Sequence, residues 1–135
     1  REIYNLTGLR YAKNLTYLNL TFNNIKDISE LKYLTKLEKI VLWHNNIEDL
    51  TPLETLINLK HLEIDDNKII SIEPLKNLTN LNTLWASFNK IKDIESLKNL
   101  INMNLRKFIL LHYIILTKIS IKILYVVNIW KNNVG

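Results

Sequence analysis

The side chains best suited to chemistry in this sequence are two histidines and the carboxylates near them. His44 and Asp66 are 22 residues apart, and His61 lies two residues before Glu63. An imidazole beside a carboxylate can act as an acid–base pair or hold a divalent metal ion. Whether His44 meets Asp66 depends on the elements that carry them.

Few other features of the sequence support catalysis. The chain has no cysteine, which excludes disulfide scaffolds, cysteine-based zinc sites and thiol catalysis. It also gives no sign of a glycine-rich phosphate loop, a nucleophile elbow or a pocket of clustered carboxylates. Histidine and aspartate on a solvated face are usually ordinary surface residues. We therefore predict a protein that is not an enzyme, with no cofactor and no metal site, and keep an unrecognised hydrolase as the alternative of another class.

Leucine and isoleucine, 25 and 20 of the 135 residues, recur with a period of 22 residues. Reading from Leu15, the unit is L-x-x-L-x-L-x-x-N-x-I-x-x-I-x-x-L-x-x-L-x-x, and 31 of the 32 specified positions in four copies match, Ala86 being the exception. A repeat of this length is typical of a solenoid. Residues 1–14 fit the closing half of a truncated earlier repeat. The four copies are residues 15–36, 37–58, 59–80 and 81–102.

The first part of each unit alternates like a strand. Leu18 and Leu20 should point inward, while Tyr17, Asn19 and Thr21 should point outward. Successive copies would stack these short strands into a parallel sheet with a spacing of about 4.8 Å. The return path of each unit has only about ten residues, which favours 3₁₀ or single-turn helices.

Turn chemistry marks the beginning of the return path. Thr7, Ser29 and Thr51 are suitable helix N-caps. Pro52 and Pro74 occupy the position after the cap, where a missing N–H costs nothing.

One asparagine per unit stands in a single column at the turn that leaves the strand. A buried amide has both a donor and an acceptor, so it can tie the backbone of one coil to the next. We predict a structural asparagine ladder rather than a binding site. Its members are Asn23, Asn45, Asn67 and Asn89.

This repeat resembles that of leucine-rich repeat proteins. The segments NLTGLRYAKNLTYLNL, LTPLETLINLKHLEI and EPLKNLTNLNTL are most similar to internalin-type bacterial repeats. The resemblance implies an α/β leucine-rich repeat solenoid: a right-handed arc with a concave parallel sheet and a convex side of 3₁₀ or short helices. It also implies a helical cap upstream of the first half-repeat.

The resemblance to internalins further implies a secreted or surface-attached bacterial protein that binds a protein of a host or neighbouring cell. The 22-residue spacing also resembles the intracellular repeat subunit that regulates a serine/threonine phosphatase, which would imply a cytoplasmic location. The domains that accompany the repeats in the parent protein would discriminate between these two functions.

The outward side chains of successive strands should form columns across the sheet, and this face is the predicted partner-binding surface. Trp43 and Trp85 are the expected anchors, because solvent-facing aromatic side chains often mark protein contacts. Asp65 and Asp66 beside Glu63 would form an acidic spot for a basic side chain. The predicted partner-binding residues are Tyr17, Asn19, Thr21, Lys39, Val41, Trp43, His44, His61, Glu63, Asp65, Asp66 and Trp85.

Three aromatic residues of this region also have a structural interpretation. Trp85 can fill the space above the small Ala86. Phe22 and Phe88, at the strand exits, are expected to tuck under the turn as large apolar side chains.

Residues 103–135 do not follow the repeat. Residues 1–103 contain 13 Lys or Arg and 13 Asp or Glu, so the whole net charge of +5 lies in this tail. A neutral solenoid gives no basis for nucleic-acid binding. Three interpretations of the tail stay open: short strands that cover the end of the solenoid, a frame-slipped or truncated end, and a membrane span over 108–130. Lys118 and Lys122 near its middle disfavour the span.

Overall fold

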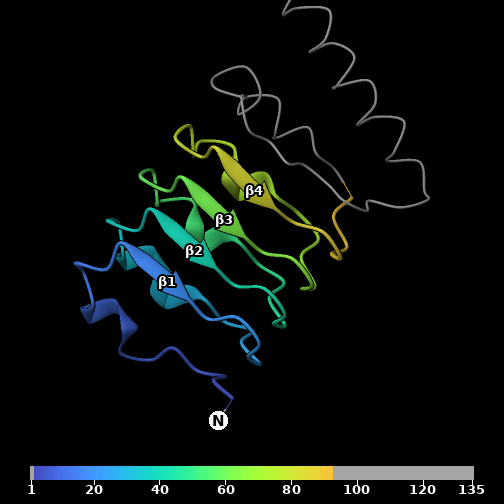
Figure 1. The fold of residues 1–135 in the computed structure, drawn as a ribbon, viewed down its shortest axis with the longest axis horizontal. Helices are drawn as coiled ribbons and strands as arrows, with labels where there is room; N and C mark the ends of the chain where they lie inside the picture. Colours follow the sequence, from blue (N-terminus) through green and yellow to red (C-terminus); the bar gives the residue numbers. More distant parts are fainter. Residues whose placement is uncertain (1, 93–135) are drawn as a thin grey trace, which may run out of the picture.

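A computed structural model describes residues 2–92 of the chain. In these residues, four strands form one parallel sheet in the order β1-β2-β3-β4, one strand in each coil (Figure 1). The strands are β1 (Tyr17–Asn19), β2 (Lys39–Val41), β3 (His61–Glu63) and β4 (Thr83–Trp85). The return segments carry the 3₁₀ helices η1 (Leu9–Tyr11), η2 (Ser29–Tyr33), η3 (Thr51–Leu53) and η4 (Glu73–Leu75). The predicted solenoid with a parallel sheet and short 3₁₀ turns is confirmed.

The register of the sheet repeats the period of the sequence. Tyr17 pairs with Lys39, Lys39 with His61, and His61 with Thr83. Beyond each strand the backbone continues the ladder: the amide of Leu20 donates to the Val41 carbonyl at 2.8 Å. The backbone hydrogen bonds of the sheet therefore repeat from each coil to the next.

The core is a single stack of leucine and isoleucine side chains between the sheet and the 3₁₀ helices. Each coil covers the apolar side chains of its neighbours, so burial of this surface drives the stacking. Leu18 and Leu20 point into the core, as the alternation predicts. The fully buried side chains include Ile25, Leu31, Leu34, Leu37, Ile40, Leu42, Ile47, Leu53, Leu56, Leu59, Leu62, Ile64, Ile69, Leu75 and Leu78.

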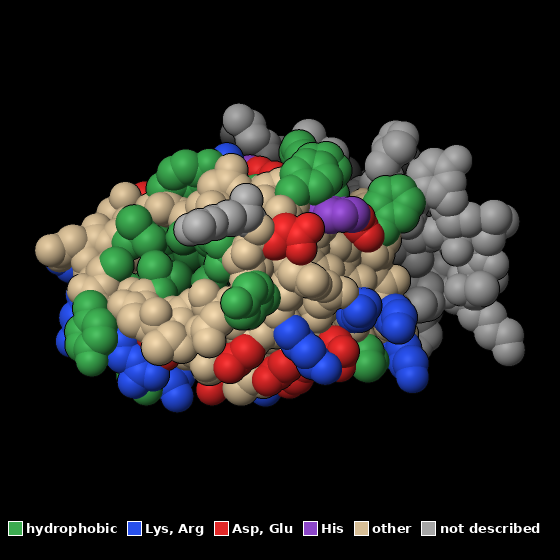
Figure 2. Space-filling view, turned by 90° about the horizontal axis from the view of Figure 1, so that it is seen from below, with side chains coloured by type: hydrophobic (Ala, Val, Ile, Leu, Met, Phe, Trp, Pro, Cys, Tyr) green, Lys and Arg blue, Asp and Glu red, His purple; other side chains and the backbone are tan. Residues whose placement is uncertain are grey.

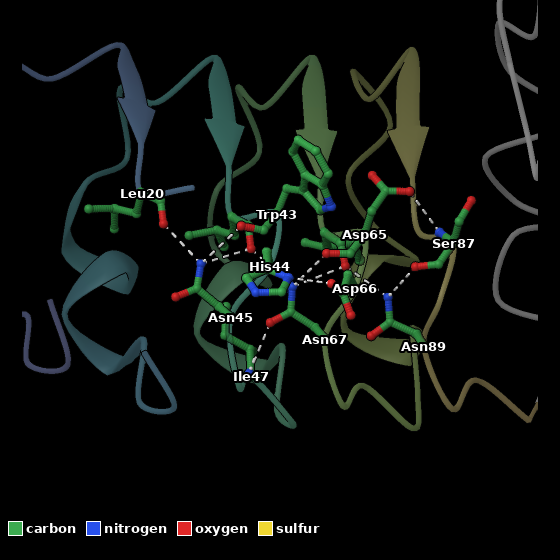
Figure 3. Close-up of polar contacts among 12 residues, drawn as sticks. Leu20, Trp43, His44, Asn45, Ile47, Asp65, Asp66, Asn67, Ser87 and Asn89 are labelled. Carbon is green, nitrogen blue, oxygen red and sulfur yellow. Dashed lines mark hydrogen bonds and ion pairs between the residues drawn. The ribbon is translucent and has the colours of Figure 1, made fainter. Parts of the chain in front are cut away.

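The asparagine ladder links the coils as predicted (Figure 3). The Asn45 side-chain oxygen accepts a hydrogen bond from the Ile25 amide of the preceding coil at 3.0 Å. Its Nδ2 donates to the Leu20 carbonyl at 2.9 Å and to the Leu42 carbonyl at 3.0 Å. Asn67 repeats the pattern, since its side-chain oxygen accepts from the Ile47 amide at 3.0 Å. The amides thus pair backbone groups that the turn would otherwise leave buried and unsatisfied.

The prediction that Ser29 and Thr51 are N-caps is wrong. Both are the first residues of their helices, and the backbone amide of each donates to an aspartate two residues earlier, Asp27 and Asp49, at 2.8 Å. In such a turn the aspartate side chain accepts the hydrogen bond of the backbone amide. The capping side chain is therefore the aspartate, two residues before the residue predicted to cap the helix.

The remaining turn predictions had mixed outcomes. Thr7 is not a cap either, because η1 is preceded by Gly8, whose φ of +92° suits glycine. Pro52 and Pro74 lie in the first turn of η3 and η4, as predicted.

An ion pair between the exposed Arg10 and the buried Glu30, which has no counterpart in the sequence pattern, joins the first two return segments. Arg10 Nε donates to the two Glu30 carboxylate oxygens at 3.0 and 2.9 Å, and the Arg10 backbone amide donates to the same carboxylate at 3.1 Å. Arg10 also lies over the Tyr33 ring, with its guanidinium carbon 4.8 Å from the ring centroid. The hydrogen bonds from Arg10 lower the pKa of Glu30 from 4.5 to about 2.

Some predictions concern residues that the structure does not describe. The second half of the fourth repeat and the tail, residues 103–135, lie outside the described residues, and the exact repeat boundaries stay predictions. Within residues 2–92, no helix has the length and hydropathy needed to cross a membrane.

Replacing Asn67 by alanine should lower the free energy of unfolding by about 1–3 kcal/mol, because the change leaves buried backbone groups without partners. Asn58→Ala is the matched control: Asn58 is exposed and donates one hydrogen bond to the Thr35 carbonyl. The Asn58→Ala change should lower the free energy of unfolding by about 0.5 kcal/mol or less. Urea unfolding followed by circular dichroism measures both, and equal costs would contradict the ladder's role.

The Arg10–Glu30 pair predicts a specific dependence of stability on pH. Because the pKa of Glu30 is lower in the folded chain than its ordinary 4.5, the pair stabilises the fold above about pH 4.5. That stability is lost as the pH falls towards 2. The Tm of the wild type should therefore exceed that of Glu30→Gln at pH 7, and the gap should narrow between pH 4.5 and 2.

Thermal unfolding across this pH range tests the expectation. Glu54→Gln, which neutralises an exposed carboxylate, is the control and should show no such convergence. If the plots of Tm against pH for the wild type and Glu30→Gln stay parallel, the pair does not stabilise the folded state.

Candidate protein-interaction face

The sheet carries most of the predicted partner-binding residues on its outward face. The register brings Asn19, Val41, Glu63 and Trp85 into one column across the four strands. Trp43 and Trp85 are each 41% exposed, although both side chains are large and apolar. Val41 differs from the expectation, because it is only 6% exposed and offers almost no surface to a partner.

The turn that follows each strand has an unusual backbone. Phe22, His44, Asp66 and Phe88 all have φ between 51° and 55°, in the left-handed region that side chains other than glycine rarely adopt. The asparagine after each of these residues fills the space under the turn with its amide. The side chain before it must therefore point outward.

This geometry overturns the expectation for the two phenylalanines. Phe22 is 59% exposed and Phe88 is 68% exposed, so neither tucks under the turn. Both belong to the surface of the face.

Aromatic rings gather at two places on this surface. The Phe22 ring centroid lies 4.8 Å from that of Trp43 and 4.9 Å from that of His44, with the rings tilted. The His61 ring lies 6.3 Å from Trp85. Figure 2 shows hydrophobic side chains on both sides of a histidine, with acidic side chains next to it. We call Phe22, Trp43 and His44 the aromatic cluster.

The acidic side chains of the face already have partners within the chain. Asp66 forms an ion pair with His44 Nδ1. Glu63 lies 2.6 Å from His61 Nε2 and 3.6 Å from Lys39 Nζ. Consequently both histidines bridge to carboxylates, as their spacing allows.

Asp65 is held in another way. Its carboxylate accepts a hydrogen bond from the Ser87 amide at 2.9 Å (Figure 3). Burial of the Asp65 carboxyl raises its pKa above the ordinary value. Each of the three carboxylates therefore already makes at least one polar contact within the chain.

Chemically, each histidine–carboxylate pair offers two ligands or one acid–base couple. Among residues 2–92, no group of three or more His, Asp or Glu is placed to hold a metal ion. A catalytic zinc site normally uses three protein ligands and a water. In each pair the carboxylate contacts one ring nitrogen and so orients the imidazole ring.

A shallow groove of about 470 Å³ runs across the coils at the strand-exit side of the face. The aromatic cluster contributes Phe22 and His44, and the asparagine ladder contributes its floor. The lining residues are Glu2, Phe22, Asn23, Asn24, His44, Asn45, Asn46, Asp66, Asn67 and Lys68. Sequence reasoning missed this groove, because it depends on the left-handed turn.

Stacked coils with one short parallel strand, a 3₁₀ return and an asparagine ladder define a leucine-rich repeat solenoid. The family model for leucine-rich repeats in two copies matches residues 13–55 and 57–99, so the chain belongs to the leucine-rich repeat family. A comparison with curated protein sequences finds no match.

Solved structures place the chain near the internalins. It is similar to internalin C2 of Listeria monocytogenes, with 40% identity and a TM-score of 0.74 over 82% of this chain and 48% of that one. It is also similar to an internalin (inlF) of the same species, with 31% identity and a TM-score of 0.54 over 76% of this chain and 37% of that one.

A third similar structure is the plant peptide hormone receptor RGFR1 in complex with RGF2. The identity is 26% and the TM-score is 0.60, over 70% of this chain and 16% of that one. The chain spans less than half the length of each of these proteins.

The left-handed turn predicts how substitutions at Phe22 behave. Asparagine tolerates the left-handed region, whereas a β-branched residue does not. Phe22→Val should therefore be less stable than Phe22→Asn by about 1–2 kcal/mol, the cost of a left-handed backbone. Urea unfolding of the two variants measures the difference. Equal stabilities would show that the turn relaxes to another conformation.

Proposed function

We propose that this chain is a protein-binding scaffold, not an enzyme, and that its concave sheet face docks a partner protein through Trp43 and Trp85. One observation carries the proposal: two tryptophans on the same face, one just beyond β2 and the other on β4, each keep 41% of their surface in contact with water. Exposed aromatic side chains of this size are enriched among the residues that dominate binding energy.

The surroundings of the two tryptophans hold them in place. Trp43 packs against Phe22 with ring centroids 4.8 Å apart, and Trp85 lies beside His61, which Glu63 orients. Both tryptophans lie on or directly after a strand of a regular sheet. A preorganised anchor loses less conformational entropy on binding than a mobile one, so this arrangement favours recognition.

The relatives support a binding role of the same kind. Two of the similar structures are internalins, and the third is a receptor that was solved in complex with a peptide hormone. By this similarity we propose that the parent protein acts at the surface of a bacterium and contacts a protein of another cell. Among residues 2–92, neither histidine pair has a third His, Asp or Glu placed to hold a metal ion with it, which favours a role without catalysis.

A displayed library of random peptides, selected on the immobilised wild-type protein, tests the proposal. Synthetic copies of the enriched peptides should lose at least tenfold in affinity when Trp43 and Trp85 are both changed to alanine, since hot-spot residues contribute about 2 kcal/mol or more each. Fluorescence anisotropy measures the Kd, and circular dichroism verifies that the variants fold.

The matched control is the double variant Ile57→Ala and Ile70→Ala. It removes two exposed apolar side chains that lie outside the sheet strands, and it should leave the Kd within about twofold. Enriched peptides that bind the folded tryptophan variant as tightly as the wild type would contradict the proposal.

A further inference from the structure

We infer that the partner of this face presents an acidic segment, and that Lys68 and Lys90 at the strand-exit edge receive its carboxylates. The inference rests on the proposed function, and it specifies the chemistry of the segment that docks. It also reverses the charge that the sequence suggested for the partner.

The first argument concerns the carboxylates of the face. Asp66 is paired with His44, and Glu63 is shared by His61 and Lys39. Asp65 accepts the Ser87 amide. Each of these carboxylates therefore has fewer free acceptor positions for a basic side chain of a partner, which weakens the attraction that the acidic residues offer.

The second argument concerns the two lysines. Lys68 and Lys90 are exposed, and neither side chain has an ion-pair partner among residues 2–92. They occupy equivalent positions in adjacent coils, so their backbones lie one strand spacing, about 4.8 Å, apart. Two like charges on adjacent coils repel, so a carboxylate placed between them would gain from both.

The backbone holds these lysines in a regular column. The amide of Asn24 donates to the Ile3 carbonyl, and the corresponding bond recurs in each later coil at the same distance of 2.9 Å. In the later coils the backbone amide of Asn46 donates to the Ile25 carbonyl, that of Lys68 to the Ile47 carbonyl, and that of Lys90 to the Ile69 carbonyl. The side chains of the column therefore lie at fixed spacing along the edge of the face.

The charge of the side chains changes along the column from one coil to the next. The column begins with the carboxylate of Glu2, continues with the amides of Asn24 and Asn46, and ends with the two lysines. The Asn46 amide donates to the Asn24 side-chain oxygen, which aligns these two dipoles along the column. A segment that crosses the coils in the groove would thus place its acidic part over Lys68, which lines the groove, and next to Lys90 in the following coil, away from Glu2.

An apolar contact lies next to the basic end. Phe88 is 68% exposed and precedes Lys90 by two residues, while the groove has Phe22 in its wall. An acidic residue flanked by an apolar residue fits this end of the column.

Peptide selection tests the inference. Peptides enriched from a random displayed library on the wild-type protein should contain more Asp and Glu than the library and fewer Lys and Arg. Synthetic copies should bind at least tenfold more weakly to the double variant Lys68→Gln and Lys90→Gln. Lys13→Gln with Lys32→Gln removes the same charge from exposed sites away from the strands, so the Kd should stay within about twofold of the wild-type value.

A second selection on the double variant Lys68→Glu and Lys90→Glu separates this inference from the proposed function. It should reverse the preference and enrich basic peptides that still depend on Trp43 and Trp85. Tryptophan-dependent peptides with no excess of acidic residues, or acidic peptides that bind the glutamine variant unchanged, would overturn the inference and leave the proposed function intact. Acidic peptides that depend on the lysines but not on the tryptophans would overturn the proposed function instead.

Discussion

The fold depends on the hydrogen bonds that one asparagine side chain forms in each coil. Every coil must leave its strand through a tight turn, and the turn would leave buried N–H and C=O groups unpaired. The amide of Asn45 accepts from the preceding coil and donates to carbonyls of two coils, which closes the turn and joins neighbours at once. With this amide under the turn, the residue before it takes a left-handed backbone and points its side chain to the surface. One side chain thus shapes both the stack and the edge of its binding face.

Much of the architecture was predictable from the sequence, because in a solenoid each repeat contacts only its neighbours and the period determines the register. The inward leucines, the columns of the sheet and the asparagine ladder all follow from that rule. The exposure of Phe22 and the burial of Val41 do not, since they depend on the direction of single side chains. The Arg10–Glu30 pair was missed for a related reason: the positions equivalent to Glu30 in the next coils are Pro52 and Pro74, so no periodic signal marks it.

The same regularity explains how a neutral solenoid can present a selective surface. The core uses the inward positions of every repeat, which leaves the outward positions free to differ from coil to coil. On this chain they hold two exposed tryptophans, two histidine–carboxylate pairs and a column that changes from Glu2 to Lys90. Glu63, Asp65 and Asp66 each already have a contact within the chain, whereas Lys68 and Lys90 have no ion-pair partner among residues 2–92. Burial of the tryptophan rings would then provide most of the affinity for a partner, and the lysines at the edge of the face would orient the partner.

The central claim is that the sheet face, and not the 3₁₀ side, is the surface that this protein uses for recognition. A crystal structure of the chain with a bound peptide tests it most directly. The account predicts that the peptide crosses the strands, covers the rings of Trp43 and Trp85, and places a carboxylate within hydrogen-bonding distance of Lys68 or Lys90. A peptide seated on the side formed by η2, η3 and η4, with both tryptophans still exposed, would contradict it.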